Sequence, residues 1–178
     1  FKTNEYADLE GGHDFEPKEE NPLIGWRGVS RYISEEFRDA FILECKAIKK
    51  VRDQDLRNVH VMLPFVRTLG EVEKCVAILE KQELRRSKDF KLWLMVEVPS
   101  MIFLIEEFCN LGIDGISFGT NDLTGLILGV DRDSAKLEKM GYFDERNLAV
   151  QRAIEIVIRG CQKYNVTTSC CGQAPSKY

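Results

Sequence analysis

Two carboxylates that follow apolar runs are the side chains best suited to chemistry. Asp122 lies in Ser117-Phe118-Gly119-Thr120-Asn121-Asp122-Leu123-Thr124, and Glu97 lies in Met95-Val96-Glu97-Val98-Pro99. Each stands where a strand is expected to open into a loop. Magnesium takes oxygen ligands, commonly one or two carboxylates, and leaves its other positions to water and substrate. The pair predicts a Mg²⁺ site formed by Glu97 and Asp122.

Each acidic side chain also has a simpler interpretation, because a carboxylate at this point can cap the following helix. Asp122 in particular stands where capping residues are found. Glu97 is harder to explain in this way, since a carboxylate embedded in an apolar run costs several kcal/mol unless it is paired or metal-bound. Two carboxylates at equivalent strand ends therefore favour the metal pair.

Arginines supply candidate anion contacts. Arg27 lies between Gly25 and Gly28, and glycine lets the backbone approach a ligand closely. A guanidinium binds phosphate or carboxylate in a bidentate manner. Arg31, one helical turn further on, is expected to make only a salt bridge. Arg132 has an aspartate on each side, so spacing alone leaves its role open.

Two adjacent cysteines end the last apolar run. Successive strand residues face opposite ways, so only one of Cys170 and Cys171 can point at a shared site. Such a thiol is an acid/base or a nucleophile where its surroundings set the pKa, or else an inert buried group. The backbone of Gly119, Thr120 and Asn121 could offer N–H groups to a phosphate. Glycine-rich nucleotide loops of the Walker or dinucleotide type are not present.

The spacing of apolar residues predicts alternating helices and strands. Ser34 is expected to cap the first helix, and notable polar residues such as Arg67 fall just after strands. The expected helices are 34–51, 72–79, 101–109 and 150–161; the expected strands lie within 59–66 and at 92–98, 115–118 and 166–171; residues 1–22 are expected to be irregular, and 125–146 a long loop region with at most a short helix.

This alternation predicts an α/β fold with a parallel sheet and right-handed crossovers. In a (β/α)8 TIM-type barrel the polar residues after strands would line the active-site face. A doubly wound open sheet is the alternative, and it also binds ligands at strand C-termini. Only about four strands are visible, so residues 1–178 are expected to form one domain that is an incomplete portion of a barrel. A chain that starts at Phe1 without methionine looks like part of a longer protein.

Bulk composition describes an ordinary soluble protein. Apolar residues make up 44% and charged residues 30% of the 178 residues. The net charge of −4 argues against nucleic acid as a partner. Apolar runs are too short to cross a membrane, and the six cysteines include no pair with zinc-ligand spacing. We expect reduced thiols and a cytoplasmic protein with neither a nucleic-acid nor a membrane partner.

Six segments, in order along nearly the whole chain, carry a resemblance to a known family. The segments are Asn21-Pro22-Leu23-Ile24-Gly25-Trp26-Arg27-Gly28, Met62-Leu63-Pro64-Phe65-Val66-Arg67-Thr68, Val96-Glu97-Val98-Pro99-Ser100, Phe118-Gly119-Thr120-Asn121-Asp122-Leu123-Thr124, Val130-Asp131-Arg132 and Cys171-Gly172-Gln173. In these segments the chain resembles the C-terminal phosphoenolpyruvate/pyruvate-binding domain of the PEP-utilising enzymes, which include phosphoenolpyruvate synthase, pyruvate phosphate dikinase and Enzyme I of the sugar phosphotransferase system. Residues 64–68 and 172–176 look like the synthase rather than its relatives.

The resemblance implies a (β/α)8 barrel and a role for each candidate residue. Cys171, directly before a glycine, would carry the proton to and from the methyl or methylene carbon, while Cys170 faces the core. The implied magnesium ligands are Glu97 and Asp122; the implied substrate contacts are Arg27, Arg132, Gly119, Thr120 and Asn121, with Asn121 at the phosphoryl group.

The implied reaction makes phosphoenolpyruvate from pyruvate, ATP and water. Its phosphohistidine lies on a separate domain of the full-length protein, charged by an ATP-binding domain, and neither His13 nor His60 stands in such a motif. The family's barrel has strands before Phe1 and after Tyr178, so this chain alone is expected to be inactive. Exposed sheet edges make a homo-oligomer plausible. Two other interpretations stay open: another Mg²⁺-enolate barrel, such as a 2-oxo acid lyase or aldolase, and a non-catalytic dimerisation module.

Overall fold

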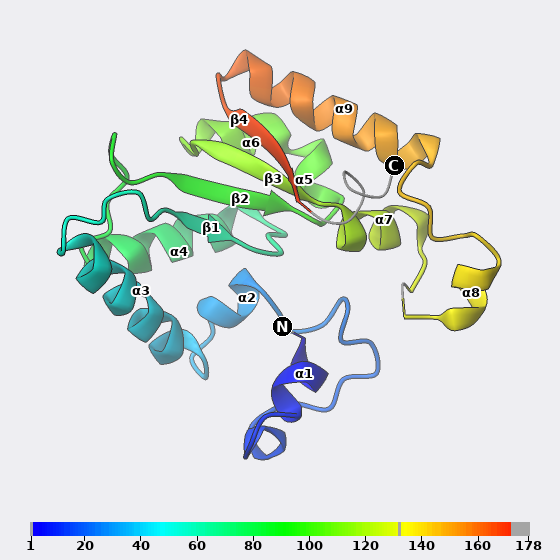
Figure 1. The fold of residues 1–178 in the computed structure, drawn as a ribbon, viewed down its shortest axis with the longest axis horizontal. Helices are drawn as coiled ribbons and strands as arrows, with labels where there is room; N and C mark the ends of the chain where they lie inside the picture. Colours follow the sequence, from blue (N-terminus) through cyan, green and yellow to red (C-terminus); the bar gives the residue numbers. More distant parts are fainter. Residues whose placement is uncertain (1, 132, 172–178) are drawn as a thin grey trace.

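Within the part of the chain that the structure describes, four strands form one parallel sheet whose order follows the sequence (Figure 1). The computed structural model describes residues 2–131 and 133–171. The strands are β1 (Val61–Leu63), β2 (Leu92–Val96), β3 (Gly115–Gly119) and β4 (Thr167–Cys171). The helices are α1 (Thr3–Ala7), the 3₁₀-helix η1 (Gly12–Asp14), α2 (Val29–Tyr32), α3 (Arg38–Arg52), α4 (Leu69–Lys81), α5 (Ser100–Phe103), α6 (Ile105–Asn110), α7 (Thr120–Leu128), α8 (Ala135–Lys139) and α9 (Leu148–Lys163).

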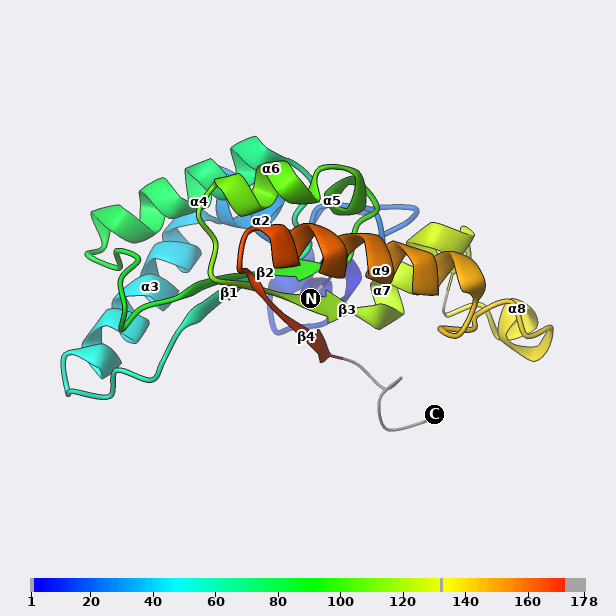
Figure 2. The same cartoon turned by 90° about the horizontal axis from the view of Figure 1, so that it is seen from above.

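Helices cover one face of this sheet. Figure 2 shows α4, α5, α6 and α9 on the same side of the strands. A doubly wound sheet reverses its strand order and carries helices on both faces. The sequential order seen here, with crossovers on one side, is the one expected for consecutive strands of a barrel. The α/β fold with a parallel sheet is thus confirmed, and closure into a barrel stays a prediction.

Alternation along the strands assigns one set of side chains to the core and the other set to the opposite face. Leu92, Leu94 and Val96 of β2 are buried in the core cluster with residues of α4, α6 and α9. The residues between them, Trp93 and Met95, are only half-buried on the other face. Since Glu97 continues this second set, the carboxylate belongs to the face that the helices leave open.

Hydrogen bonds between neighbouring residues determine where α4, the helix that follows β1, begins. Thr68 caps α4: its hydroxyl accepts the Glu71 N–H at 3.3 Å, and the Glu71 carboxylate accepts the Thr68 N–H at 3.0 Å. This reciprocal capping box satisfies two backbone donors at the helix start. The same Glu71 carboxylate accepts the Arg67 N–H at 2.8 Å. Local hydrogen bonds among Arg67, Thr68 and Glu71 therefore fix the backbone between β1 and α4.

The last helix packs closely on α6. Gly160 of α9 has no side chain where a Cβ would lie 2.6 Å from Ile105. Val157 and Cys161 are fully buried beside it. This contact explains the 3.6-residue apolar period of 150–161, which correctly predicted a helix.

Several predicted boundaries are wrong. The helix after the first loop begins at Arg38, not at Ser34, whose hydroxyl instead accepts the Phe37 N–H at 3.2 Å within the preceding turn. The segment 101–109 is two helices that meet at Leu104, a break that the apolar spacing does not reveal. Residues 1–22 contain α1 and η1, and residues 125–128 belong to α7.

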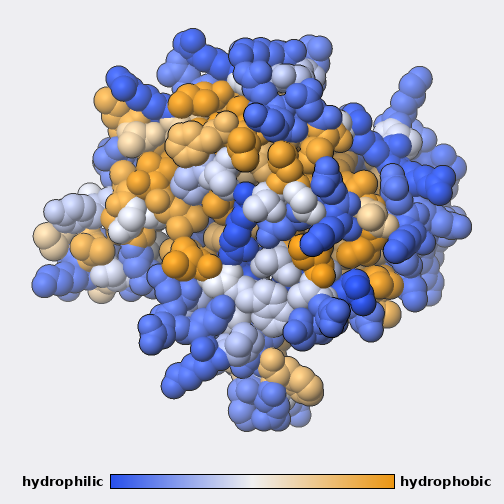
Figure 3. Space-filling model, turned by 180° about the vertical axis from the view of Figure 1, so that it is seen from behind, coloured by the Kyte–Doolittle hydropathy of each residue, from blue (hydrophilic) through white to orange (hydrophobic). Residues whose placement is uncertain are grey.

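Apolar side chains also reach the outer surface. Figure 3, seen from behind, shows several hydrophobic patches between polar ones. Phe103, Leu43 and Ile156 are 82%, 66% and 52% exposed.

None of the described helices is long and apolar enough to cross a membrane.

Candidate functional site

The site residues gather at the carboxyl edge of the sheet. Glu97 directly follows β2, Thr120 directly follows β3, and Cys171 is the last residue of β4. The strands are parallel, so their carboxyl ends lie along the same edge. Segments as distant in the sequence as 97, 120 and 171 are thereby brought to one place.

Glu97 is buried and fitted against a glycine. Its side chain accepts the Phe65 N–H at 2.6 Å, and the residue is 8% exposed. A Cβ on Gly119 would lie 2.5 Å from Glu97 Cγ and 2.9 Å from Oε1. Position 119 must therefore be glycine for the carboxylate to occupy this place, a role that differs from the predicted contact to substrate.

A second carboxylate lies beside the first. Asp122, in the first turn of α7, is 6% exposed. Burial and the negative charge of Asp122 raise the pKa of Glu97 to about 7, against the opposing effects of the Phe65 N–H and the Arg27 charge. A buried carboxylate whose ionisation is disfavoured by a second carboxylate beside it forms a pair that a cation would stabilise.

Arg27 is the positive partner of this pair. Its Nη2 lies 2.8 Å from Asp122 Oδ2, and its guanidinium lies 4.1 Å from the centre of the Phe65 ring. Its Nη1 also donates to the Leu23 carbonyl at 3.3 Å. Arg27, the predicted anion contact, thus lies at the carboxylate pair. It belongs to residues 24–30, a loop that runs into the first two residues of α2 and that we call the Arg27 loop.

Thr120 and Asn121 begin the helix that carries Asp122. The Thr120 hydroxyl donates to Glu145 Oε1 at 2.5 Å, and the residue is 2% exposed. Its hydroxyl therefore serves an internal hydrogen bond, and only its backbone is left for the predicted substrate contact. Asn121 is half-buried in the first turn of α7, where backbone N–H groups lack intrahelical acceptors.

Strand register separates the two cysteines at the end of β4. Cys171 pairs with Gly119, and Cys170 pairs with Phe118. Phe118 is part of the core, so Cys171 belongs to the same open face as Glu97. Both cysteines are exposed, and the Cys170 pKa is raised by partial burial and by its neighbours Cys171 and Glu145. Arg132 and the segment 172–178 lie outside the described residues.

Other residues organise the site without having been singled out. Phe65 turns its N–H toward Glu97 from a left-handed backbone with φ of 51°, which is unusual for a bulky residue. Glu145 reaches the strand ends from the segment between α8 and α9. Neither position carries a sequence signal, because each depends on a long-range contact.

The donor set suits a hard divalent cation. Among the described residues no group of three or more His, Cys, Asp or Glu could hold a metal ion. Two carboxylates meet the requirement of Mg²⁺, which commonly leaves its remaining positions to water and substrate.

These features define an α/β protein with a buried acidic pair and an arginine at the carboxyl edge of a parallel sheet. The chain belongs to the PEP-utilising enzyme family: residues 4–178 match the profile described as "PEP-utilising enzyme, PEP-binding domain". The predicted resemblance is therefore confirmed.

Curated relatives agree with this assignment. The chain is 57% identical to phosphoenolpyruvate synthase of Aeropyrum pernix, 55% to a probable phosphoenolpyruvate synthase of Staphylothermus marinus and 47% to phosphoenolpyruvate synthase of Escherichia coli. Each match covers 100% of this chain and 22%, 21% and 22% of the relative. The chain thus spans about a fifth of the length of these proteins.

A solved structure shares the fold. A citrate lyase from Burkholderia xenovorans superposes with a TM-score of 0.54 at 23% identity, over 77% of this chain and 41% of that one. At this identity the likeness concerns the α/β fold alone.

Proposed function

We propose that this chain is the substrate-binding part of a phosphoenolpyruvate synthase, a pyruvate, water dikinase. The whole protein would make phosphoenolpyruvate from pyruvate, ATP and water. Residues 1–178 would form a portion of one (β/α)8 barrel domain. A phosphohistidine domain and an ATP-binding domain of the same full-length chain would be its partners.

The observation that carries this proposal is the buried pair of Glu97 and Asp122 with Arg27 beside it. Pyruvate and phosphoenolpyruvate are anions, and a carboxylate pair repels them unless a cation is held between. Glu97 and Asp122 would hold Mg²⁺, and Arg27 would bind the substrate carboxylate or phosphate. The names of the relatives supply the reaction.

Different residues of this chain would bind the substrate, hold the metal ion and transfer the proton. Arg27 would orient the substrate anion together with Arg132, which is not among the described residues. Asn121 and the backbone of residues 119–121 would contact the phosphoryl group. Bound at the acidic pair, Mg²⁺ would supply Lewis-acid stabilisation of the negative charge that develops on an enolate oxygen. Cys171, as thiolate, would take a proton from the methyl carbon, so the C–H electron pair becomes the C=C bond and the carbonyl electrons move to oxygen.

The second half of the reaction needs the rest of the protein. The enolate oxygen would attack the phosphorus of the phosphohistidine, and the P–N bond would break as the new P–O bond forms. We therefore propose that this chain alone does not turn over. A cytoplasmic location and a homo-oligomer that covers the apolar patches or the sheet edges fit the same assignment.

Titration calorimetry with oxalate, a planar enolate mimic, tests the binding half directly. The wild-type chain and Glu97→Gln are titrated with and without Mg²⁺. Glu107→Gln is the matched control, because Glu107 is exposed on α6. We expect Mg²⁺-dependent binding in the wild type and the control, and its loss in Glu97→Gln.

Two results would count against the proposal. Equal oxalate binding with and without Mg²⁺ would remove the metal role of the acidic pair. Retro-aldol cleavage of a 2-oxo acid by the full-length protein without ATP would assign it to a lyase instead.

A further inference from the structure

Arg67 stands just beyond β1, outside the group of residues assigned to metal or substrate. Its guanidinium is directed at the Arg27 loop. Nη2 donates to the Gly25 carbonyl at 2.5 Å and to the Ile24 carbonyl at 3.4 Å. Nη1 donates to Ser30 Oγ at 3.2 Å and to the Arg27 carbonyl at 3.4 Å. All four acceptors belong to one loop.

The main chain of Arg67 is itself anchored. Its N–H donates to Glu71 on α4 at 2.8 Å, and its carbonyl accepts the Ser100 hydroxyl of α5 at 2.7 Å. Arg67 thus connects two helices that cover the sheet with the Arg27 loop and the start of α2.

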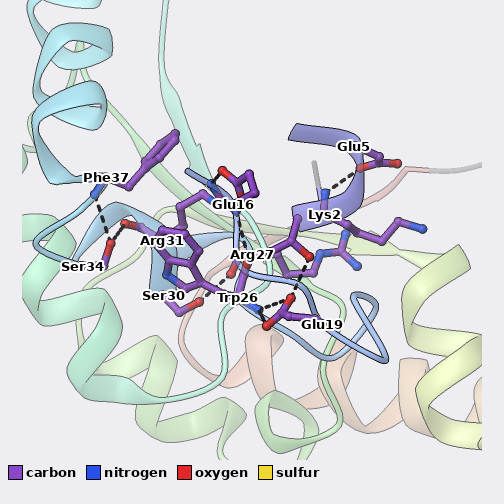
Figure 4. A network of polar contacts seen from close by, with 11 residues as sticks. Lys2, Glu5, Glu16, Glu19, Trp26, Arg27, Ser30, Arg31, Ser34 and Phe37 are labelled. Carbon is purple, nitrogen blue, oxygen red and sulfur yellow. Dashed lines mark hydrogen bonds and ion pairs between the residues drawn. The ribbon is translucent and has the colours of Figure 1, made fainter. Parts of the chain in front are cut away.

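A carboxylate contacts the same turn of the loop. Glu19 accepts the Trp26 N–H at 2.9 Å (Figure 4). It also accepts the Thr3 hydroxyl at 2.8 Å. Gly25 leaves room for it, because a Cβ there would overlap the Glu19 carboxylate. The turn that precedes Arg27 is therefore held by one acidic and one basic side chain from distant parts of the sequence.

The placement of Arg67 has an electrostatic cost. Its Cζ lies 4.6 Å from the centre of the Phe65 ring, over which Arg27 also lies. Burial lowers the pKa of Arg67, Glu71 opposes this, and the charge of Arg27 lowers it further. An ordinary surface arginine would avoid a second guanidinium, so the position needs the compensation that the loop acceptors provide.

We propose that Arg67 is a positioning residue that holds the Arg27 loop and thereby places the Arg27 guanidinium at Asp122. The inference rests on the proposed function in one respect, namely that Arg27 binds the substrate anion. The alternative is that Arg67 contacts substrate directly. Its hydrogen bonds to the loop favour the positioning role.

The test uses Arg67→Lys, which keeps the charge and loses the planar fork that reaches several acceptors. Arg57→Lys is the control, since Arg57 is exposed near the opposite end of the sheet. Amide hydrogen exchange of residues 24–30 is measured without ligand. We expect faster exchange of the Arg27 loop in Arg67→Lys and no change in Arg57→Lys.

Oxalate affinity in Mg²⁺ then separates positioning from direct contact. Arg67→Lys should weaken binding about tenfold, as expected for lost hydrogen bonds to a charged group. In the double variant with Arg27→Gln, the loss should equal that of Arg27→Gln alone, because Arg67 acts through Arg27. Additive losses would overturn the inference in favour of direct contact.

The outcomes for the two proposals are distinct. If the wild-type chain binds no oxalate, the proposed function fails, and loop exchange alone decides the role of Arg67. Unchanged loop exchange in Arg67→Lys overturns the inference whatever the affinity. If Arg67→Lys does not fold, Ser30→Ala removes one acceptor only, and faster loop exchange is again expected; unchanged exchange there overturns the inference equally.

Discussion

Replacement of Glu97 by glutamine should stabilise the metal-free chain at neutral pH. Burial and Asp122 raise the pKa of this carboxyl from its ordinary 4.5 to about 7. The folded chain therefore binds a proton that the unfolded chain has released between these two pH values. The free energy of unfolding falls as the pH rises through this window.

The magnitude follows from the shift. At about 1.4 kcal/mol for each pH unit, the ionised Glu97 costs about 3 kcal/mol of stability at pH 8. Glutamine has nearly the same shape and stays neutral, and its amide oxygen can still accept the Phe65 N–H. Glu97→Gln should therefore match the wild type near pH 4.5 and exceed it by about 3 kcal/mol at pH 8.

Urea unfolding followed by circular dichroism, with EDTA throughout, measures this difference at several pH values. Glu107→Gln is the control, and its difference from the wild type should not change across the same window. If the wild-type and Glu97→Gln stabilities run parallel from pH 4.5 to pH 8, the carboxyl is not held at a raised pKa and the reasoning is refuted. The stabilised variant should at the same time lose Mg²⁺-dependent oxalate binding, since the proposed function assigns Mg²⁺ binding to the same charge that destabilises the fold.

Three further variants probe other contacts. Gly119→Ala should weaken Mg²⁺-dependent oxalate binding at least about tenfold, because its Cβ would displace the Glu97 carboxylate; Gly70→Ala, whose Cβ meets nothing within 4 Å, is the calorimetric control. Cys171→Ser should keep oxalate binding but abolish the exchange of pyruvate methyl protons with solvent that the full-length protein catalyses, as measured by NMR. Cys170→Ser is the control and should catalyse this exchange at the normal rate. Arg31→Met should destabilise the chain by about 3 kcal/mol in urea, because Arg31 and its ion-pair partner Glu16 are almost completely buried; a loss below about 1 kcal/mol, as for an exposed pair, would contradict this.

The sequence predicted those parts of the fold that depend on local periodicity. Apolar runs located β2 and β3, and the 3.6-residue spacing located α4 and α9. Helix boundaries were less accurate: α3 begins after Phe37, which makes no side-chain capping hydrogen bond and whose ring contacts Tyr6 and Tyr32, so no capping signal marks this start. Alternation alone fits a barrel and a doubly wound sheet equally; the sequential strand order favours the barrel, whose closure stays a prediction.

The candidate site was predictable in its residue types and not in its contacts. Carboxylates after strands indicated Glu97 and Asp122, since parallel strands bring their ends together. The ion pair between Arg27 and Asp122 joins residues 95 positions apart, and no local pattern encodes it. Phe65 was overlooked because its role lies in a backbone conformation, which side-chain chemistry does not reveal.

The distribution of thiols gives this chain a built-in attachment point for probes. Burial raises the pKa of Cys45 to about 11 and of Cys75 and Cys161 to about 12, and Cys109 is also buried with a raised pKa. The thiolate is the nucleophile that attacks a maleimide, so these four thiols should label slowly at neutral pH. The two exposed cysteines both lie at the end of β4. A fluorophore added to Cys171 in Cys170→Ser would therefore lie on the same open face as Glu97, and ligand binding could be followed optically without any engineered cysteine.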